Sequence, residues 1–176
     1  MENVTNQEEH ILSILVRNRP GVLARAAGVL GRLGYNIASL CVAETADPAV
    51  SRITLTSEAD LDFKEKIQKH LDKLVDVIEV ADYTGASFFR RELMLLHIRL
   101  RAEDRAEILR TIELCRGRIL LMQEESCLIE VSGDPDHLGG VMRCFRDSGI
   151  LAVNRSGTIA LPRTAADPEE IPILPV

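Results

Sequence analysis

The sequence predicts an α+β protein built from two ferredoxin-like βαββαβ domains, and three observations lead to this prediction. Apolar residues make up 46% of the 176 residues, which is enough to form a core in each half of the chain. Runs with strand character and runs with helical spacing follow the order strand, helix, strand, strand, helix, strand, and this order occurs twice. The stretch "YTGASF", residues 83–88, separates the two series, so we expect domains at residues 10–83 and 84–163.

The first series begins with "HILSILVR", which is apolar at nearly every position, as in a central strand buried on both faces. The run from Pro20 to Leu33 has helical spacing, and Gly34 ends it because glycine accepts the left-handed conformation of a C-terminal cap. The remaining elements are the strands "NIASLCVAE" and "VSRITLTSE", the helix "DLDFKEKIQKHLDKL" and the strand "VDVIEVADY".

Alternation and helical spacing also predict which side chains face the core. Alternation places Ile53 and Leu55 inward and Thr54 and Thr56 outward. The predicted core faces of the two helices consist of Leu23, Ala26, Ala27, Leu30 and Leu33, and of Leu61, Ile67, Leu71 and Leu74.

The second series repeats the order without obvious sequence identity to the first. Its last helix is predicted to start at Asp134-Pro135 and to stop at Gly149. Residues 1–9 and 164–176 are expected to be flexible tails. The elements of this series are the strand "RRELMLLHIRL", the helix "EDRAEILRTIELC", the strands "GRILLMQ" and "SCLIEVSG", the helix "DPDHLGGVMRCFRDSG" and further strand in "ILAVNRSGTIAL".

Charge and composition exclude several classes of partner. The net charge is −6 and aromatic residues make up only 3%, so neither nucleic acid nor an anionic membrane is expected to bind. No uncharged run approaches the ~18 residues that a membrane span needs. The first ten residues are polar and acidic, unlike a secretory signal, and we expect a cytoplasmic protein. The cysteines lack CxxC spacing and are expected to be buried reduced thiols: Cys41, Cys115, Cys127 and Cys144.

No catalytic or metal site is predicted. The histidines lie on different elements, where surface or strand-end positions are expected: His10, His70, His97 and His137. No GxSxG, GxGxxG or GxxxxGK motif with the required context is present. The glycines of "GVLGRLG" lie within the first helical run and are expected to allow its close packing on the sheet or on a partner.

The stretch "RNRPGVLARAAGVLGRLGYNIASL", residues 17–40, has the chemistry of an amino-acid site. Asn18 is predicted to cap the helix, Pro20 suits its first turn, and Gly21 permits close approach of a ligand to the backbone. Free N–H groups and the helix dipole would attract a carboxylate, while the amide oxygens of Asn18 and Asn36 suit an ammonium group. Capped turns of this kind are common and usually bind nothing, so the pattern alone leaves a ligand-free turn as the alternative.

Longer segments resemble a known family. "RPGVLARAAGVLGRLGYNIASL", "ADPAVSRITLT" and "LDKLVDVIEV" are similar to the ACT domain of the small regulatory subunit of acetolactate synthase. "RRELMLL", "CRGRI", "IEVSG" and "VNRSGTIAL" resemble the C-terminal domain of that subunit in order and spacing. The resemblance extends from about His10 to Arg163.

The resemblance implies a non-catalytic regulatory subunit. Such a subunit would bind a catalytic large subunit that carries thiamine diphosphate, FAD and Mg²⁺, raise its activity and confer feedback inhibition by a branched-chain amino acid, usually valine. It also implies a homodimer in which two ACT domains pair side by side with the effector at their interface. An unpaired edge strand in a lone βαββαβ sheet favours the same pairing. The implied effector-binding residues are Asn18, Pro20, Gly21, Val22 and Leu23 of one copy, with Asn36 and Ile37 of the other.

Four positions depart from the family pattern and leave the effector's identity open. An acidic residue is usual where Arg17 stands, and Leu33, Ala38 and Leu121 replace an Arg, a Glu and an Asp. A free-standing ACT-type sensor that controls transcription or another enzyme is the alternative function, although no helix-turn-helix or basic stripe favours it. An enzyme on a ferredoxin-like scaffold is a third, without a nucleophile–base pair to support it.

Overall fold

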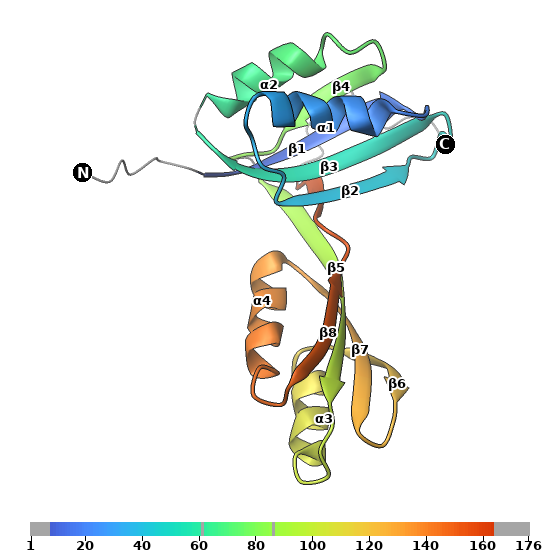
Figure 1. Cartoon of the computed structure of the whole chain (residues 1–176), viewed down its shortest axis with the longest axis vertical. Helices are drawn as coiled ribbons and strands as arrows, with labels where there is room; N and C mark the ends of the chain where they lie inside the picture. Colours follow the sequence, from blue (N-terminus) through green and yellow to red (C-terminus); the bar gives the residue numbers. More distant parts are fainter. Residues whose placement is uncertain (1–7, 61, 86, 164–176) are drawn as a thin grey trace, which may run out of the picture. The chain divides into compact units, whose positions relative to one another are not determined.

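The computed structural model describes residues 8–60, 62–85 and 87–163 and has the predicted α+β architecture (Figure 1). Contacts divide the chain into two compact units. The first contains the residues up to Phe89 together with those from Thr158 onward, and the second is formed by Arg90–Gly157. The elements of the first series are β1 (Glu8–Arg17), α1 (Val22–Arg32), β2 (Ser39–Glu44), β3 (Val50–Ala59), α2 (Phe63–Leu71) and β4 (Val77–Asp82). Those that follow are β5 (Phe88–Arg99), α3 (Arg105–Leu114), β6 (Arg118–Met122), β7 (Ser126–Gly133), α4 (Pro135–Cys144), β8 (Ile150–Arg155) and β9 (Ile159–Pro162).

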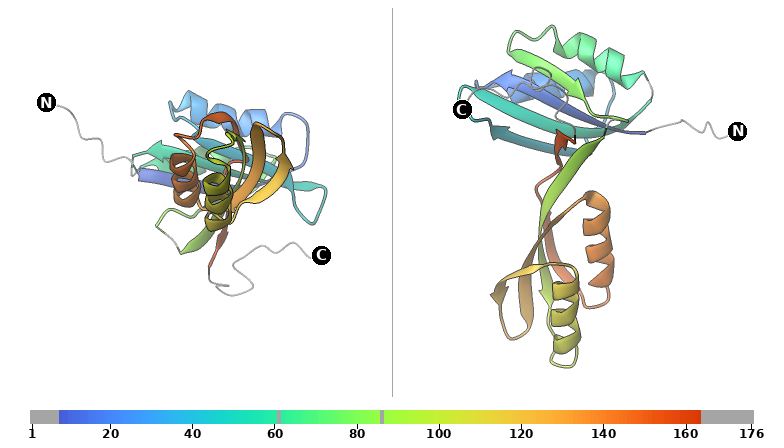
Figure 2. Two further views of the ribbon diagram at one scale, coloured as in Figure 1. Left: turned by 90° about the horizontal axis from the view of Figure 1, so that it is seen from below. Right: turned by 180° about the vertical axis from the view of Figure 1, so that it is seen from behind.

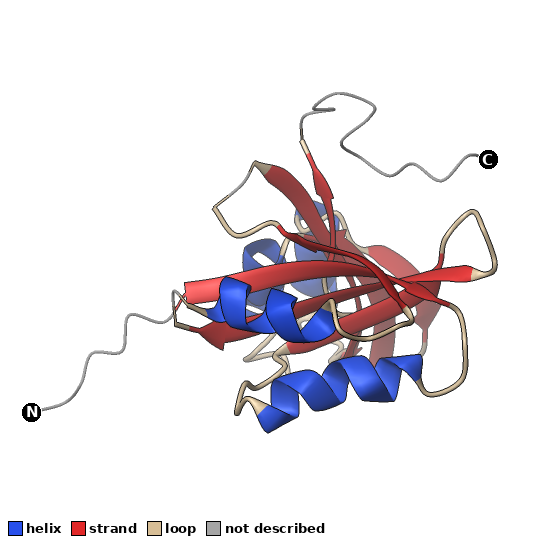
Figure 3. Cartoon of the chain, turned by 90° about the horizontal axis from the view of Figure 1, so that it is seen from above, coloured by secondary structure: helices blue, strands red, loops and turns tan. Residues whose placement is uncertain are grey.

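The sheet of the first unit has the order β2-β3-β1-β4, and its paired strands are antiparallel. Both helices cover one face of this sheet (Figure 3). Ile14, Leu30 and Phe63 are fully or almost fully buried in the core between the sheet and the helices. This arrangement is the ferredoxin-like fold that the element order predicted.

The other face of that sheet is also covered. Ile11, Ser13 and Leu15 alternate with the core residues of β1, yet each is 2% exposed. Strand β9 pairs with β5 and contacts β3 on this side, and Thr158 N–H donates to Ser39 Oγ over 3.5 Å (Figure 2). The double-sided burial predicted for β1 is therefore confirmed.

Three expectations about the first sheet, the chain ends and the domain boundary differ from the structure. Thr54 and Thr56 do not face solvent: each is 3% exposed, because the face to which they belong is covered. β1 begins at Glu8, so residues 8 and 9 belong to the strand, while 1–7 and 164–176 lie outside the described residues. Strand β9, expected within residues 84–163, groups with the first unit.

The helices confirm the predicted spacing but shift the predicted faces. Leu23 is 40% exposed, whereas Val22 and Val29 are buried on α1 beside the predicted Ala26 and Leu30. On α2 the fully buried residue that the sequence analysis missed is Phe63, whose ring lies 4.6 Å from that of His10 and 4.7 Å from that of Tyr35. Leu61 lies outside the described residues.

The second unit repeats the arrangement, with sheet order β6-β7-β5-β8 and both helices packed on one face. Its core contains Met94, Leu96, Ile129 and Phe145, all at 0–1% exposure. Asp134 caps α4 as predicted, accepting a hydrogen bond from the His137 N–H at 2.8 Å.

Two expectations about this unit and its side chains were wrong. α4 ends at Cys144 rather than near Gly149, which instead has φ +92° just before β8. His10 lies near the start of β1, one of the two kinds of position expected, and is buried there at 2% exposure, with Nδ1 3.1 Å from Thr84 Oγ1. Cys127 is buried, but Cys144 is exposed. Among the described residues, no helix is long and apolar enough to cross a membrane, and no cluster of side chains could hold a metal ion.

Candidate functional site

The turn between β1 and α1, residues 18–21, is one half of the predicted site and is called the bend below. Gly21 occupies the N-cap of α1 with φ +81°, a left-handed conformation that other residues adopt only with strain. The prediction that Asn18 caps the helix was wrong, because no side chain caps α1 and the helix starts only at Val22. Pro20 accordingly precedes the helix instead of lying in its first turn.

Asn18 fixes the bend to the loop between β2 and β3. Its N–H donates to Ala49 O at 2.7 Å, and its Nδ2 donates to Pro48 O at 2.9 Å and to Glu44 Oε1 at 3.0 Å. On the other side, Arg17 N–H donates to Asp76 O at 2.8 Å. The bend is therefore held in one conformation from two sides, which preorganises it for a ligand.

Charge around the bend favours an anion. Arg25 Nη2 lies 2.5 Å from Asp76 Oδ2, and Arg19 Nη1 lies 3.9 Å from Asp76 Oδ1, so two guanidinium groups face one carboxylate. Within the described part of the chain, the N–H groups of Leu23 and Ala24 find no acceptor, as expected for a helix start. These groups and the helix dipole together suit a carboxylate.

The two apolar residues that follow the bend differ in exposure. Val22 is 3% exposed and belongs to the core, whereas Leu23 is 40% exposed. The arginine that departs from the family pattern, Arg17, is exposed next to the bend.

The second half of the predicted site, residues 35–38, is called the β2 start. Ser57 Oγ donates to Asn36 O at 2.7 Å, and Ala38 N–H donates to Thr56 O at 2.8 Å, which fixes this segment against β3. Ile37 is partly buried against the core. A cavity of about 470 Å³ opens here, and Tyr35, Asn36, Ala38, Glu58 and Asp60 are among the residues that line it.

The cavity at the β2 start is acidic. Burial and the neighbouring Asp60 carboxylate, which accepts a hydrogen bond from Tyr35 Oη at 3.3 Å, raise the pKa of the Tyr35 phenol. The carboxylates of Glu58 and Asp60 and the amide oxygen of Asn36 are all acceptors for an ammonium group. Ala38, one of the four positions noted in the sequence, lines this cavity without adding a charge.

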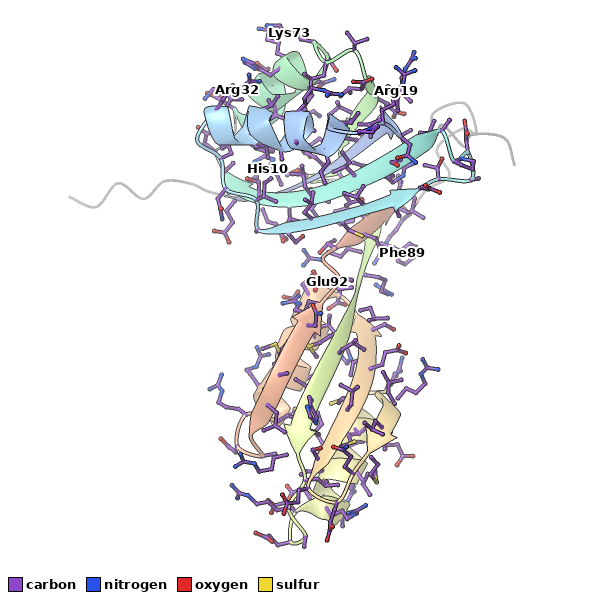
Figure 4. All side chains as sticks on the ribbon, turned by 45° about the vertical axis from the view of Figure 1, so that its right-hand side comes forward. His10, Arg19, Arg32, Lys73, Phe89 and Glu92 are labelled. Atoms are coloured by element: carbon purple, nitrogen blue, oxygen red, sulfur yellow. The ribbon has the colours of Figure 1, made fainter. Side chains whose placement is uncertain are left out.

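One copy of the chain does not bring the two halves together. The bend precedes α1 and the β2 start follows it, and a helix of 11 residues spans about 16 Å. The labelled Arg19 and Arg32 mark these two ends of the helix (Figure 4). A ligand that contacts both halves therefore needs the β2 start of another copy.

Several residues of these two surfaces escaped the sequence analysis. Asp76, Glu44 and Glu58 meet the site only through tertiary folding, and nothing in their local sequence marks them. Arg25 could have been found, since it is four residues after Gly21 and so on the same side of the first helical turn.

Comparison with known proteins identifies the family. A model of the AHAS small subunit-like ACT domain matches residues 12–79, and a model of the small subunit of acetolactate synthase matches residues 91–164. The chain is 36% identical over 157 residues to a probable acetolactate synthase small subunit of Methanothermobacter thermautotrophicus, covering 89% of this chain and 94% of that protein. It is 38% identical over 154 residues to the acetolactate synthase isozyme 3 small subunit of Salmonella typhimurium, with coverage of 87% and 94%. The chain belongs to the family of acetolactate synthase small subunits.

A solved structure from this small-subunit family agrees with the fold. The crystal structure of the acetolactate synthase small subunit from Thermotoga maritima matches with a TM-score of 0.83 and 31% identity, and covers 89% of this chain and 98% of that one. The predicted family and the ferredoxin-like fold are therefore confirmed. Both the bend and the β2 start lie inside the segment matched as a small-subunit ACT domain.

Proposed function

We propose that the chain is the regulatory subunit of an acetolactate synthase. It binds a catalytic large subunit, raises the activity of that subunit, and makes it sensitive to feedback inhibition by a branched-chain amino acid, with valine as the first candidate. Membership in the small-subunit family supports this proposal, as does the pair of complementary surfaces in the ACT domain. Thiamine diphosphate, FAD and Mg²⁺ would belong to the catalytic partner.

The observation that carries the effector site is the position of β2 at the edge of its sheet. Glu44, the last residue of β2, accepts a hydrogen bond from Asn18 of the bend, while Asn36 lies three residues before Ser39, the first residue of β2. If two β2 strands pair antiparallel across a two-fold axis, the end of each lies beside the start of the other. The bend of one copy would then face the β2 start of its partner, giving two equal sites in each dimer.

The chemistry of the two surfaces fits the two ends of an amino acid. At the bend, helix N–H groups with Arg19 and Arg25 would hold the carboxylate. At the partner's β2 start, the Asn36 amide oxygen with Glu58 and Asp60 would hold the ammonium group. Apolar atoms of Leu23 and Ile37 would cover a branched side chain, whose burial contributes roughly 1.5–3 kcal/mol.

Reconstitution of the enzyme tests the proposal. The purified chain is mixed with the catalytic large subunit from the same organism, and acetolactate formation is measured with and without millimolar valine, leucine or isoleucine. We expect higher turnover on addition of the chain and partial loss of that gain with valine. Unchanged turnover would reject the regulatory-subunit function and leave the free-standing sensor. Activation without a response to any of the three would reject only the effector site.

A further inference from the structure

Strand β6 leaves a long apolar edge uncovered in the second unit. It forms one edge of that sheet and pairs only with β7. All five of its residues are exposed, including four consecutive large apolar ones: Ile119 at 40%, Leu120 at 42%, Leu121 at 50% and Met122 at 37%. An edge strand presents unpaired N–H and C=O groups, and an apolar one is a template for another strand.

The usual protection against such pairing is weak along β6. Natural edge strands carry lysines, prolines or inward-pointing charges that oppose pairing with a second chain. The four apolar residues include none of these, and one bulge, at Leu120, interrupts the pairing with β7. The position corresponds to β2 in the first unit, since the sheet orders are β6-β7-β5-β8 and β2-β3-β1-β4.

Charges of opposite sign flank the two ends of the strand. Arg116 precedes β6, and Glu124 and Glu125 follow it. Arg118 is already engaged, with Nη2 3.0 Å from Glu130 Oε1 on β7, but Arg116, Glu124 and Glu125 form no ion pair with any described residue.

Arg116 also stands where glycine is usual. It has φ +55° in the turn that ends α3, where its N–H donates to Glu113 O and the Gly117 N–H donates to Ile112 O. Glycine is the usual residue at this left-handed position of a helix C-terminus. Arg116 therefore adopts a backbone conformation that costs some strain, and its side chain is exposed beside β6.

We propose that β6 pairs antiparallel with β6 of a second copy of the chain, about a two-fold axis near Leu120. Arg116 and Glu124 lie at equal separations from Leu120 along the chain, so this pairing sets Arg116 of each copy beside Glu124 of the other. The apolar residues of the two strands then cover each other, and the two sheets join into one. This self-association surface is separate from the ACT-domain pairing through β2 and does not depend on it.

Cysteine cross-linking in the full chain tests the position of the axis. Leu120→Cys is compared with Leu151→Cys, which lies on β8, the opposite edge strand of the same sheet, and is similarly exposed at 46%. Both variants also carry Cys144→Ser, because Cys144 is exposed. After mild oxidation with oxidised glutathione at micromolar protein, we expect covalent dimers of the Leu120→Cys chain on non-reducing gels and essentially none of the Leu151→Cys chain.

Charge reversal then tests the partner. In the Leu120→Cys background, Arg116→Glu sets two acidic residues against each other and should slow cross-linking by roughly five- to tenfold at low salt. Glu124→Arg should do the same, and the double reversal should restore the original rate. High salt should remove the differences, since these groups are exposed.

Three results would overturn the proposal. These are equal cross-linking of the Leu120→Cys and Leu151→Cys chains, no rescue by the double reversal, and cross-linking that requires the catalytic subunit, which would assign the edge to that subunit. The outcome is distinguishable from a failure of the regulatory function, because activation and valine response are measured separately on the chain with its native residues.

Discussion

Gly21 meets two requirements that no other residue type meets together. Its φ of +81° starts α1 at the required angle, and a Cβ there would lie only 3.0 Å from Arg25 Nη1. Arg25 is in turn held by Asp76 at 2.5 Å. The absent side chain thus lets the Arg25 guanidinium lie close to the backbone of the bend.

The first prediction at the residue scale concerns Gly21→Asp. The added carboxylate would occupy the place of the effector's own carboxylate and repel it. We expect loss of valine binding in calorimetry, with activation of the catalytic subunit largely retained. Gly21→Asn is the matched control, because it has nearly the same shape and a similar tolerance of positive φ without the charge. Unaltered valine binding by the Asp variant would show that the bend is not the carboxylate site.

Asn18 illustrates a limit of reasoning from single residues. Its type and its place before a helical run favour an N-cap, but the left-handed Gly21 delays the start of α1 to Val22. Its side chain instead ties the bend to Pro48 and Glu44. Its structural role therefore comes from contacts distant in sequence, and its part in an effector site stays a prediction.

At the scale of the element, α1 shows how burial follows the helical period. Val22, Ala26, Val29 and Leu30 form its buried face. The prediction that the glycines of "GVLGRLG" pack on the sheet was wrong. Apart from the helix's own backbone and the adjoining residues, no described atom lies within 4 Å of a Cβ built on Gly28 or Gly31. Packing on a partner remains a prediction.

The same change at two glycines of this helix region should have opposite effects. Gly28→Ala lies inside α1 with open space around it and should raise the free energy of unfolding by about 0.5–1 kcal/mol, because alanine is the better helix former. Gly34→Ala also meets open space, but Gly34 has φ +80°, a conformation that is strained for alanine. This substitution should therefore lower the free energy of unfolding by about 1–2 kcal/mol. Urea denaturation followed by circular dichroism measures both. Destabilisation by Gly28→Ala would indicate that a partner packs there.

At the scale of the whole molecule, the two ferredoxin-like sheets have edge strands with exposed apolar residues at corresponding positions, β2 in the first and β6 in the second. On β2 the exposed residue is Val42, at 41%, and it is paired with Ile53 of β3. The effector site proposed for the ACT domain exists only if two copies meet at β2. The proposed site therefore predicts that assembly and ligand binding are coupled.

Val42→Lys tests that coupling. Two lysines facing each other near the two-fold axis should oppose β2 pairing and raise the dissociation constant for valine by about tenfold or more, equivalent to at least ~1.4 kcal/mol. Ile78→Lys is the control, since Ile78 is 52% exposed on β4, the other edge of the same sheet. Calorimetric titration with valine compares the two. Equal affinities in both variants would contradict a site shared between copies at β2.

Local sequence patterns were sufficient to predict most of the elements. The strand character of residues 10–17 and the helical spacing of 20–33 each depend on neighbours within a few residues, so periodicity alone identified β1 and α1. Gly34 was placed correctly as a helix terminator because its role is also local. Phe63 was missed because the apolar spacing of α2 does not reveal that its ring fills the space between His10 and Tyr35.

The sequence by itself determined the two βαββαβ series, the family and the stretch that contains the bend, because periodicity, turn residues and motifs are written in consecutive residues. The tertiary structure alone decided that β9 covers the first sheet, that Asp76 holds Arg25 at the bend, and that Glu58 and Asp60 line the cavity beside Asn36. It also decided that β2 and β6 lie at edges of their sheets. The reason is physical: these contacts join residues far apart in the chain, and they form only when the apolar faces of separate elements are buried against one another.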